Sequence, residues 1–263
     1  MRRGVSALVW NVKVGAEAWR CPIVRMETVL PIEVIEQAIA RGQAALSEYE
    51  SKRVLAEFGV PVVQEELARD AAEAVQAAVR IGYPVVVKAC APSLMHKSDL
   101  GCVALNLADA AAVEAAVGQV GAAAGIALDG YLVQRMARGK REVIVGGIRD
   151  KVFGPCVMLG IGGILVEVLG DVAFRLAPLD ERDAEEMLYE LRAQQIFGAV
   201  RSEPAVDRSA LARVLMGVGR VLIECPEVSQ VDVNPLIFDG ADPIAVDALI
   251  TLCPSGQESV EVR

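Results

Sequence analysis

The sequence predicts a fold of the α/β or α+β class, and its composition is the first reason. Hydrophobic residues make up 54% of the 263 residues, which is enough apolar surface for a substantial core, whereas aromatic residues make up only 4%. A core dominated by Ala, Val, Leu and Gly suits helices that pack closely on a sheet. The second reason is that segments with helical periodicity alternate along the chain with short β-branched runs.

In the first part of the chain, apolar residues at helical spacing predict three helices. They are expected at residues 31–45, 47–58 and 70–81. Ser47, with Glu50 three residues later, forms a capping-box pattern that predicts the start of the second helix. Gly59 ends this helix ahead of a short strand, and Pro84 separates the third helix from the apolar run 85–88, which is expected to be a strand.

The remaining elements predict further strands between helices. Strands are expected at residues 103–107, 131–136, 141–148, 156–159, 164–168, 231–234 and 244–247, and helices at 109–124, 180–197 and 208–224. Glycines separate the three runs between 141 and 168, as in an antiparallel meander. The join at residues 125–130 is expected to separate two subdomains.

The net charge of −9 argues against two classes of partner. A field of this sign repels nucleic acid and anionic membrane surfaces, so neither a nucleic acid nor a membrane is expected as a partner. No apolar run reaches the ~18 residues of a membrane-spanning helix. The six cysteines include no CxxC pair, which indicates neither a zinc site nor a disulfide framework and fits a cytoplasmic protein.

The first 25 residues differ in charge from the rest of the chain, because arginines and lysines there are opposed only by Glu17. Lys13 interrupts the short apolar stretch 7–12, which makes a signal peptide a poor fit. We expect residues 1–25 to be a disordered extension, or the start to be misassigned with Met26 as the first residue. Residues 26–252 are expected to form the folded domain and residues 253–263 a tail.

The only histidine, His96, lies in a polar turn that follows an apolar run. Lys97 and Ser98 are hydrogen-bond donors in this turn, and Asp99 can orient an imidazole. Gly101 allows the backbone to approach a ligand closely. A structural histidine is usually packed, so these neighbours favour catalysis or ligand contact for His96. A neutral imidazole is a nucleophile toward phosphorus and can carry a phosphoryl group.

Lys88 ends the apolar run 85–88 and is a candidate phosphate contact. A strand buried on both faces is typically a continuous apolar run, and ligand groups collect where such a strand emerges. The alternative is that the Lys88 side chain extends to solvent without a ligand. The glycine-rich segment 160–163 is a weaker phosphate candidate, because glycines between strands are more often a tight turn. No P-loop and no Rossmann glycine motif after an opening strand is present.

Asp232, Asn234 and Asp247 form a candidate magnesium site on a predicted hairpin. Side chains alternate along a strand, so residues 232 and 234 point to the same face. A four-residue turn at 239–242 would place Asn234 opposite Asp247, whereas a tighter turn would place Asp232 there. Either register gathers the oxygen ligands that Mg²⁺ prefers. The alternative is a solvated hairpin whose acids are spread apart.

Several segments of the chain, taken in order, resemble a known enzyme family. They are "SKRVLAEFGVPV", "GYPVVVKA", "HKSDLGCV", "YLVQRMARGKREVIVGG" and "VDVNPLIF". In this order, and with "HKSD" among them, they resemble the β subunit, or ATP-grasp portion, of the ADP-forming acyl-CoA synthetases, such as ADP-forming acetate–CoA ligase. The resemblance implies an ATP-grasp fold in which two α+β subdomains clasp a nucleotide.

The resemblance also implies an activity and its participants. The reaction is acid + CoA + ATP ⇌ acyl-CoA + ADP + phosphate, with Mg²⁺ and ATP or ADP bound to this chain. The enzyme would be active only as a hetero-oligomer with a CoA-binding α subunit, which would supply the small carboxylic acid and CoA. His96 would receive a phosphoryl group from a histidine of that subunit and pass it to ADP, with Asp232 or Asp247 assisting.

The same resemblance implies roles for the other candidate residues. Lys88 would contact nucleotide phosphates, Glu142 would lie at the nucleotide site, and Asn234 with Asp247 would hold Mg²⁺. The hinge beside adenine would be formed by Gln134, Arg135, Met136 and Ala137.

Two positions depart from the family pattern. Cys102 stands where a second glycine is usual, and Arg135 stands where glutamate is common. If these changes disable the site, the chain would be a noncatalytic nucleotide-binding regulatory subunit. A stand-alone ATP-grasp carboxylate ligase is the other alternative.

Overall fold

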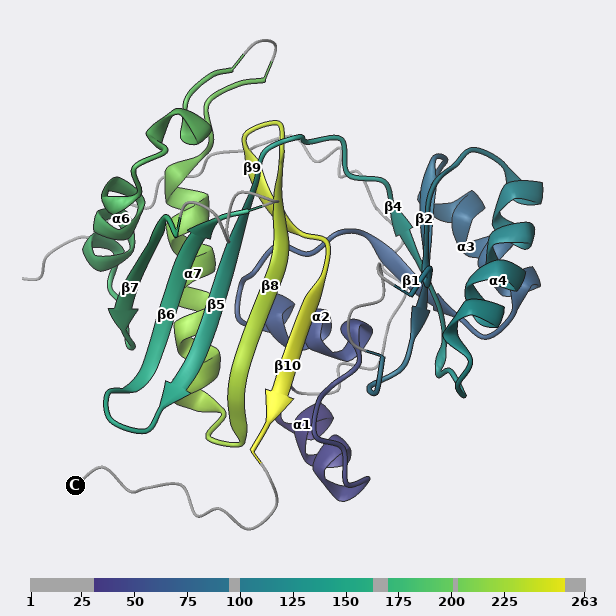
Figure 1. Ribbon diagram of the computed structural model, residues 1–263, viewed down its shortest axis with the longest axis horizontal. Coiled ribbons are helices and arrows are strands. Elements are labelled where there is room, and N and C mark those ends of the chain that lie inside the picture. The colour runs from purple at the N-terminus through teal and green to yellow at the C-terminus, as the bar shows by residue number, and fades with distance from the viewer. Residues whose placement is uncertain (1–30, 95–99, 163–169, 201–202, 254–263) are drawn as a thin grey trace, which may run out of the picture.

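The structure, a computed structural model, describes residues 31–94, 100–162, 170–200 and 203–253. These residues form two antiparallel sheets of unequal size, which lie side by side and carry helices (Figure 1). Within these ranges, no helix has the length and apolarity needed to cross a membrane. The predicted strand at 164–168 lies outside the described residues, as do the 1–25 extension and most of the tail.

The smaller sheet has four strands in the order β1-β4-β2-β3. Its strands are β1 (Glu65–Ala68), β2 (Val85–Cys90), β3 (Val103–Leu107) and β4 (Gly130–Arg135). Helices α3 (Ala71–Ile81) and α4 (Ala110–Ala124) pack on it, and small side chains of α3 such as Ala74 and Ala77 share a core with Val85 and Val87 of β2. All six residues of β2 are buried, which confirms the strand predicted from its apolar run.

The larger sheet has six strands, five of them in the order β10-β8-β5-β6-β7, while β9 pairs with β8. They are β5 (Glu142–Asp150), β6 (Gly154–Ile161), β7 (Val172–Leu176), β8 (Val228–Asp239), β9 (Asp242–Ala245) and β10 (Ala248–Leu252). Helix α7 (Arg208–Glu224) lies along one face, across β5 and β6 (Figure 1). Its buried Val214, Val218 and Leu222 join Val145 and Leu159 in the main core.

The two helices at the start of the described chain belong to the larger sheet. These are α1 (Pro31–Ala40) and α2 (Glu48–Glu57), and residues such as Ile35 and Leu55 lie in the main core. The chain therefore leaves the larger body at residues 58–64, builds the smaller sheet, and returns at 136–141. The expected join at 125–130 is wrong in position, because β4 still belongs to the smaller sheet.

Side-chain caps fix most of the helix starts that the sequence predicts. Ser47 and Glu50 form the predicted capping box at α2, and Asp109 caps α4 as predicted. The helix expected at 31–45 ends earlier, at Ala40. Strands β7 and β10 are absent from the sequence prediction, and β8 is much longer than expected.

The helix predicted at 180–197 is two shorter elements. Helix α6 (Glu181–Glu190) ends where Leu191 adopts an extended conformation, and a 3₁₀ helix follows at Gln194–Phe197. The buried Asp171 carboxylate accepts hydrogen bonds from the Arg192 and Ala193 backbone N–H groups, at 2.8 and 2.9 Å. The Asp171 side chain therefore accepts from backbone N–H groups that would bond within a continuous helix. The helical spacing of apolar residues in the sequence does not indicate this interruption.

The return crossing at 136–141 is held tightly against the β8–β9 hairpin. A Cβ at Gly139 would lie 1.9 Å from the Phe238 carbonyl oxygen, so only glycine allows this approach. Two residues on, the buried Arg141 guanidinium donates to the carbonyls of Ile196, Gly198, Pro204 and Gly240 and pairs with Glu203 at 2.8 Å. These contacts fix the start of β5.

Gly139→Ala is expected to lower the free energy of unfolding by roughly 2–4 kcal/mol, because the new methyl group meets backbone that cannot move freely. Gly118→Ala is the matched control, since Gly118 lies in α4, and no described atom beyond its own stretch of helix comes within 4 Å of where the methyl group would be. Gly118→Ala should raise the free energy of unfolding by about 0.5–1 kcal/mol, because alanine has a higher helix propensity than glycine. Urea denaturation of both variants checks the pair, and equal effects would contradict the close approach.

Candidate active site

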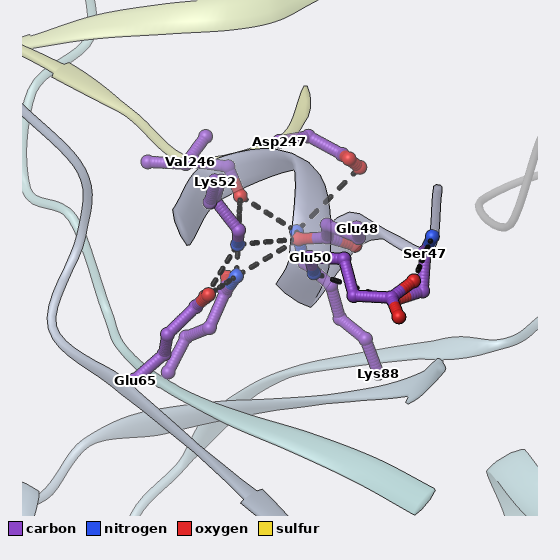
Figure 2. A network of polar contacts seen from close by, with 9 residues as sticks. Ser47, Glu48, Glu50, Lys52, Glu65, Lys88, Val246 and Asp247 are labelled. Atoms are coloured by element: carbon purple, nitrogen blue, oxygen red, sulfur yellow. Dashed lines mark hydrogen bonds and ion pairs between the residues drawn. The ribbon is translucent and has the colours of Figure 1, made fainter. Parts of the chain in front are cut away.

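Lys88 is buried at the place where the two sheets meet. Its side chain is 8% exposed, and its ammonium forms an ion pair with Glu48 at 2.7 Å (Figure 2). It also donates to the Val246 carbonyl oxygen at 2.8 Å and lies 3.6 Å from the Asp247 carboxylate. The alternative in which Lys88 extends to solvent is therefore wrong.

Two opposing effects act on the protonation of Lys88. Burial acts to lower the pKa of the ammonium, whereas attraction first to Glu48 and then to Asp247 raises it. The attraction outweighs the burial, and the pKa lies above its ordinary value. Lys88 therefore remains a cation at neutral pH, as a contact for phosphate must.

Lys88 is part of a buried polar cluster whose centre is one carboxylate oxygen. Glu48 Oε1 accepts hydrogen bonds from Lys88 Nζ and Lys52 Nζ, each at 2.7 Å, and from Gln134 Nε2 at 2.9 Å. Lys52 also pairs with Glu65, and Gln134 Nε2 donates to Glu65 at 2.7 Å. We call Glu48, Lys52, Glu65, Lys88 and Gln134 the buried cluster. It joins α2 to β1, β2 and β4.

The cluster also fixes the backbone beside Asp247. The Val246 carbonyl oxygen receives hydrogen bonds from Lys88, Gln134 and Lys52, at 2.8, 3.2 and 3.4 Å. Val246 and Asp247 make up the whole connection between β9 and β10. The cluster therefore sets the position of this connection relative to the smaller sheet.

Glu48 and Lys52 lie next to the candidate site, and the sequence did not identify them. A Glu and a Lys at i and i+4 normally form an exposed pair on a helix surface. Here each side chain is only 1% exposed, because both lie on the stripe of α2 that also buries Ser51 and Leu55. An ion pair placed on the apolar stripe of a helix is the signal that would have identified them.

The hairpin that carries the candidate metal ligands adopts the predicted register that places Asn234 opposite Asp247. Phe238 pairs with Pro243, and the Asn234 backbone N–H donates to the Asp247 carbonyl at 3.3 Å, so these two residues are opposite each other. The tighter-turn register is wrong, since Asp232 pairs with Leu249. Burial, and then the charge of Asp247, raises the pKa of Asp232 above its ordinary value. Asp232 and Asp247 are thus close enough to repel.

This donor set fits Mg²⁺ better than a metal held by protein alone. Among the described residues, no group of three or more His, Cys, Asp or Glu side chains could hold a metal ion. Mg²⁺ characteristically takes one or two carboxylates and completes its shell with phosphate oxygens and water. A cation bound beside the carboxylates of Asp232 and Asp247 would also relieve the repulsion between them.

The predicted hinge residues span the end of β4 and the start of the return crossing, and their contacts differ. Gln134 points into the buried cluster rather than toward solvent. Arg135 pairs with Asp239 of β8 at 2.8 Å and so joins the two sheets. The Met136 N–H donates to the Pro84 carbonyl at 3.2 Å, and Ala137 follows it, half-buried.

Glu142 begins β5 beside the glycine-rich segment. Its carbonyl accepts a hydrogen bond from the Gly162 N–H at 3.0 Å, and a Cβ at Gly162 would lie 2.8 Å from Glu142. The side chain of Glu142 is half-buried in this position. The glycine therefore permits β5 and the end of β6 to approach closely beside a candidate nucleotide contact.

His96 lies outside the described residues, which resume at Leu100. The flanking residues Leu94 and Cys102 are buried, 7% and 0% exposed, in a small core with Ala89 and Val120. Cys102 is thus accommodated as a packed side chain just before β3, beside the end of β2. Its Sγ lies 3.8 Å from the Leu100 carbonyl oxygen.

Comparison with known proteins agrees with this architecture. An ATP-grasp domain model matches residues 37–252, and the chain belongs to the ATP-grasp family. Within that family, it is 43% identical over 225 residues to the ADP-forming acetate–CoA ligase I subunit beta of Pyrococcus furiosus, covering 84% of this chain and 97% of that one. It corresponds to the β subunit of the ADP-forming acetate–CoA ligases.

Longer relatives and solved structures extend the comparison. The ADP-forming acetate–CoA ligase I of Archaeoglobus fulgidus is 39% identical over 208 residues, which are 78% of this chain and 30% of that protein. An acetyl-coenzyme A synthetase 1 from Ca. Korarchaeum cryptofilum, in complex with coenzyme A and Ca-AMPCP, has a TM-score of 0.81 at 37% identity, covering 84% of this chain and 99% of that one. Another structure of that synthetase, with Mg-AMPPCP, has a TM-score of 0.75 at 37% identity, covering 85% of this chain and all of that one. In it a phosphohistidine segment points towards the nucleotide binding site.

The stability that Glu65 contributes is expected to depend on pH. Burial raises the pKa of the Glu65 carboxyl above its ordinary value, and attraction to Lys52 offsets only part of the effect. A carboxyl with a raised pKa stabilises the fold fully below its unfolded pKa, and this contribution is lost as the pH rises through the folded value. The loss of unfolding free energy in Glu65→Gln should therefore be largest near pH 4 and shrink toward pH 8, as urea denaturation can measure.

Glu73→Gln provides a control of opposite sign. Hydrogen bonds from Arg69 lower the pKa of the exposed Glu73 to about 2. Any stabilisation from Glu73 is present above its unfolded pKa and is lost as the pH falls through the folded value. Solvent screening keeps this effect small. A Glu65→Gln effect that grows with pH would contradict the burial argument.

Proposed function

We propose that Lys88, Asn234 and Asp247 form the site where this β subunit binds ADP or ATP with Mg²⁺. The observation that carries the proposal is that Lys88, a buried cation, lies 3.6 Å from Asp247, which is itself opposite Asn234. A phosphate-binding cation and oxygen ligands for a metal therefore share one site between the two sheets. Phosphoryl transfer depends mainly on such positioning and on charge neutralisation.

Among the described residues, the Lys88 ammonium has two short hydrogen bonds, which leaves a third proton that could bind phosphate. Its two short contacts, to Glu48 and to the Val246 carbonyl, use two of the three ammonium protons. The 3.6 Å contact to Asp247 is longer, and the Asp247 side chain is 34% exposed, so that side of the ammonium is the accessible one. Asn234 and Asp247 would hold Mg²⁺, which supplies charge neutralisation at the phosphate oxygens.

His96 is the residue we propose as phosphoryl carrier. A ring nitrogen of His96 attacks the phosphorus of the phosphohistidine of the α subunit, and the P–N bond to that donor breaks. A β-phosphate oxygen of ADP then attacks the same phosphorus, and the P–N bond to His96 breaks to give ATP. Asp232, with its raised pKa, or Asp247 is the carboxylate that would orient the imidazole. The phosphohistidine segment of the Korarchaeum relative supports this role.

The assembly that completes the reaction is also part of the proposal. A CoA-binding α subunit would bring the small carboxylic acid and CoA, since this chain matches only 30% of the longer Archaeoglobus relative. The site is proposed to work in the cytoplasm, where the five described cysteines would remain the free thiols they are here.

His96→Ala is expected to abolish both phosphorylation of this chain and overall turnover. The test incubates the α/β complex with ATP labelled at the γ-phosphate and Mg²⁺, and follows label on each subunit. Leu100→Ala is the matched control, because Leu100 is exposed and close to the same turn but has no group that can carry phosphorus. Undiminished turnover in His96→Ala would remove His96 from the mechanism.

The same experiment separates the alternatives. An acyl phosphate formed by this chain without an α subunit would identify a stand-alone carboxylate ligase. Nucleotide binding with no phosphorylation, even when the α subunit is present, would identify a regulatory subunit. Turnover that needs both subunits supports the proposed function.

Asp247→Ala is expected to weaken ADP binding in the presence of Mg²⁺ by at least about 10-fold, the scale of a lost charge-assisted contact. Binding without Mg²⁺ should change much less. Asp242→Ala is the matched control, because Asp242 is an exposed acid at the turn of the same hairpin. Calorimetric titration with and without Mg²⁺ makes the measurement, and equal effects of the two variants would contradict the assignment of Asp247 as a ligand.

A further inference from the structure

The proposed function leaves Glu48 without a role, although it is the centre of the buried cluster. Its Oε1 atom accepts from an ammonium on its own helix, an ammonium on β2 and an amide on β4. The side chain is 1% exposed, so it is shielded from solvent. A buried carboxylate is costly unless it is paired, so its partners are held closely to it.

We infer that Glu48 is a positioning residue that holds the Lys88 ammonium and the Val246–Asp247 connection in the arrangement that binds a magnesium-bound nucleoside diphosphate. This inference rests on the proposed function. It adds to the proposed site a residue that acts through Lys88 and Val246 and does not itself contact the metal or the phosphate.

The first step of the argument concerns Lys88. A lysine side chain is flexible and has no fixed fork of donors, so its ammonium is placed only by the acceptors around it. Within the part of the chain that the structure describes, its two close acceptors are Glu48 and the Val246 carbonyl, at 2.7 and 2.8 Å. Both lie on the larger body, whereas Lys88 belongs to the smaller sheet. Glu48 therefore determines where a cation from one sheet stands relative to the other.

The second step concerns Asp247. The three donors on Glu48 Oε1 are the same three that converge on the Val246 carbonyl oxygen. If Glu48 is removed, Lys52 and Lys88 lose the carboxylate between them, and their like charges repel. The donors to Val246 are then expected to shift, and the Asp247 backbone next to it with them.

Lys52 offers a variant that separates positioning from stability. It is as buried as Glu48 and shares the same carboxylate oxygen, but its ion pairs are with Glu48 and Glu65, and its bond to the Val246 carbonyl is the longest of the three, at 3.4 Å. In Lys52→Met, Glu48 still accepts from Lys88 and Gln134. Lys52→Met should therefore destabilise the fold while leaving Lys88 in place.

The test compares wild type, Glu48→Gln and Lys52→Met as full-length chains. Thermal unfolding is measured first, and both variants are expected to have a lower Tm. Calorimetric titration with ADP and Mg²⁺ is then expected to give a Kd at least about 10-fold higher for Glu48→Gln, the scale of a lost charge-assisted contact, and within about 2-fold of wild type for Lys52→Met. In the α/β complex, the KM for ADP should rise in Glu48→Gln by a similar factor, and Lys52→Met should keep the wild-type KM.

The outcomes distinguish this inference from the proposed function. An unchanged Kd in Glu48→Gln, or an equal increase in Lys52→Met, would show that Glu48 serves stability alone. If wild type itself binds no ADP with Mg²⁺, the proposed function fails before Glu48 is tested. If Glu48→Gln fails to fold, Glu48→Asp takes its place, because it keeps the charge on a shorter side chain. Glu48→Asp is expected to raise the Kd for ADP by roughly 3-fold or more. A wild-type Kd in Glu48→Asp would overturn the inference.

Discussion

The arrangement of the site depends on one buried carboxylate oxygen, Glu48 Oε1, that is shared by donors from three elements. Removing a charged group from water costs several kcal/mol, and partners recover this only when their geometry is good. If helix α2 moved away from strands β2 and β4, Glu48 would lose its hydrogen bonds from Lys88 and Gln134 and keep only the one from Lys52 on its own helix. The polar contact thus sets how the two sheets meet at the site, while apolar packing holds each sheet to its own helices.

This constraint has a consequence for nucleotide binding. A lysine that is already desolvated and held by Glu48 loses little conformational freedom when phosphate arrives. Preorganised charges in a site shielded from water also act more strongly on a developing phosphoryl charge than solvated ones do. The second link between the sheets, from Arg135 to Asp239, differs because its side chains are partly exposed. This ion pair connects the two sheets but is not part of the buried cluster.

Local signals predicted the fold class, many of the helices and strands and part of the site, whereas the ATP-grasp fold was implied by the family resemblance. Long-range packing explains what these signals did not predict. Capping at Ser47 and the turn that places Asn234 opposite Asp247 depend only on neighbouring residues. The burial of Glu48 is different, because its partners lie up to 86 positions away in the sequence. The early end of α6 has the same origin, since Asp171 reaches it from a separate segment.

A crystal structure of the α/β complex with ADP and Mg²⁺ would test the central claim most directly. The account predicts that the Lys88 ammonium keeps its hydrogen bonds to Glu48 and the Val246 carbonyl, and that a phosphate oxygen takes the side now directed at Asp247. It would be contradicted if Lys88 left Glu48 to reach the nucleotide, or if the phosphates bound away from Lys88 altogether.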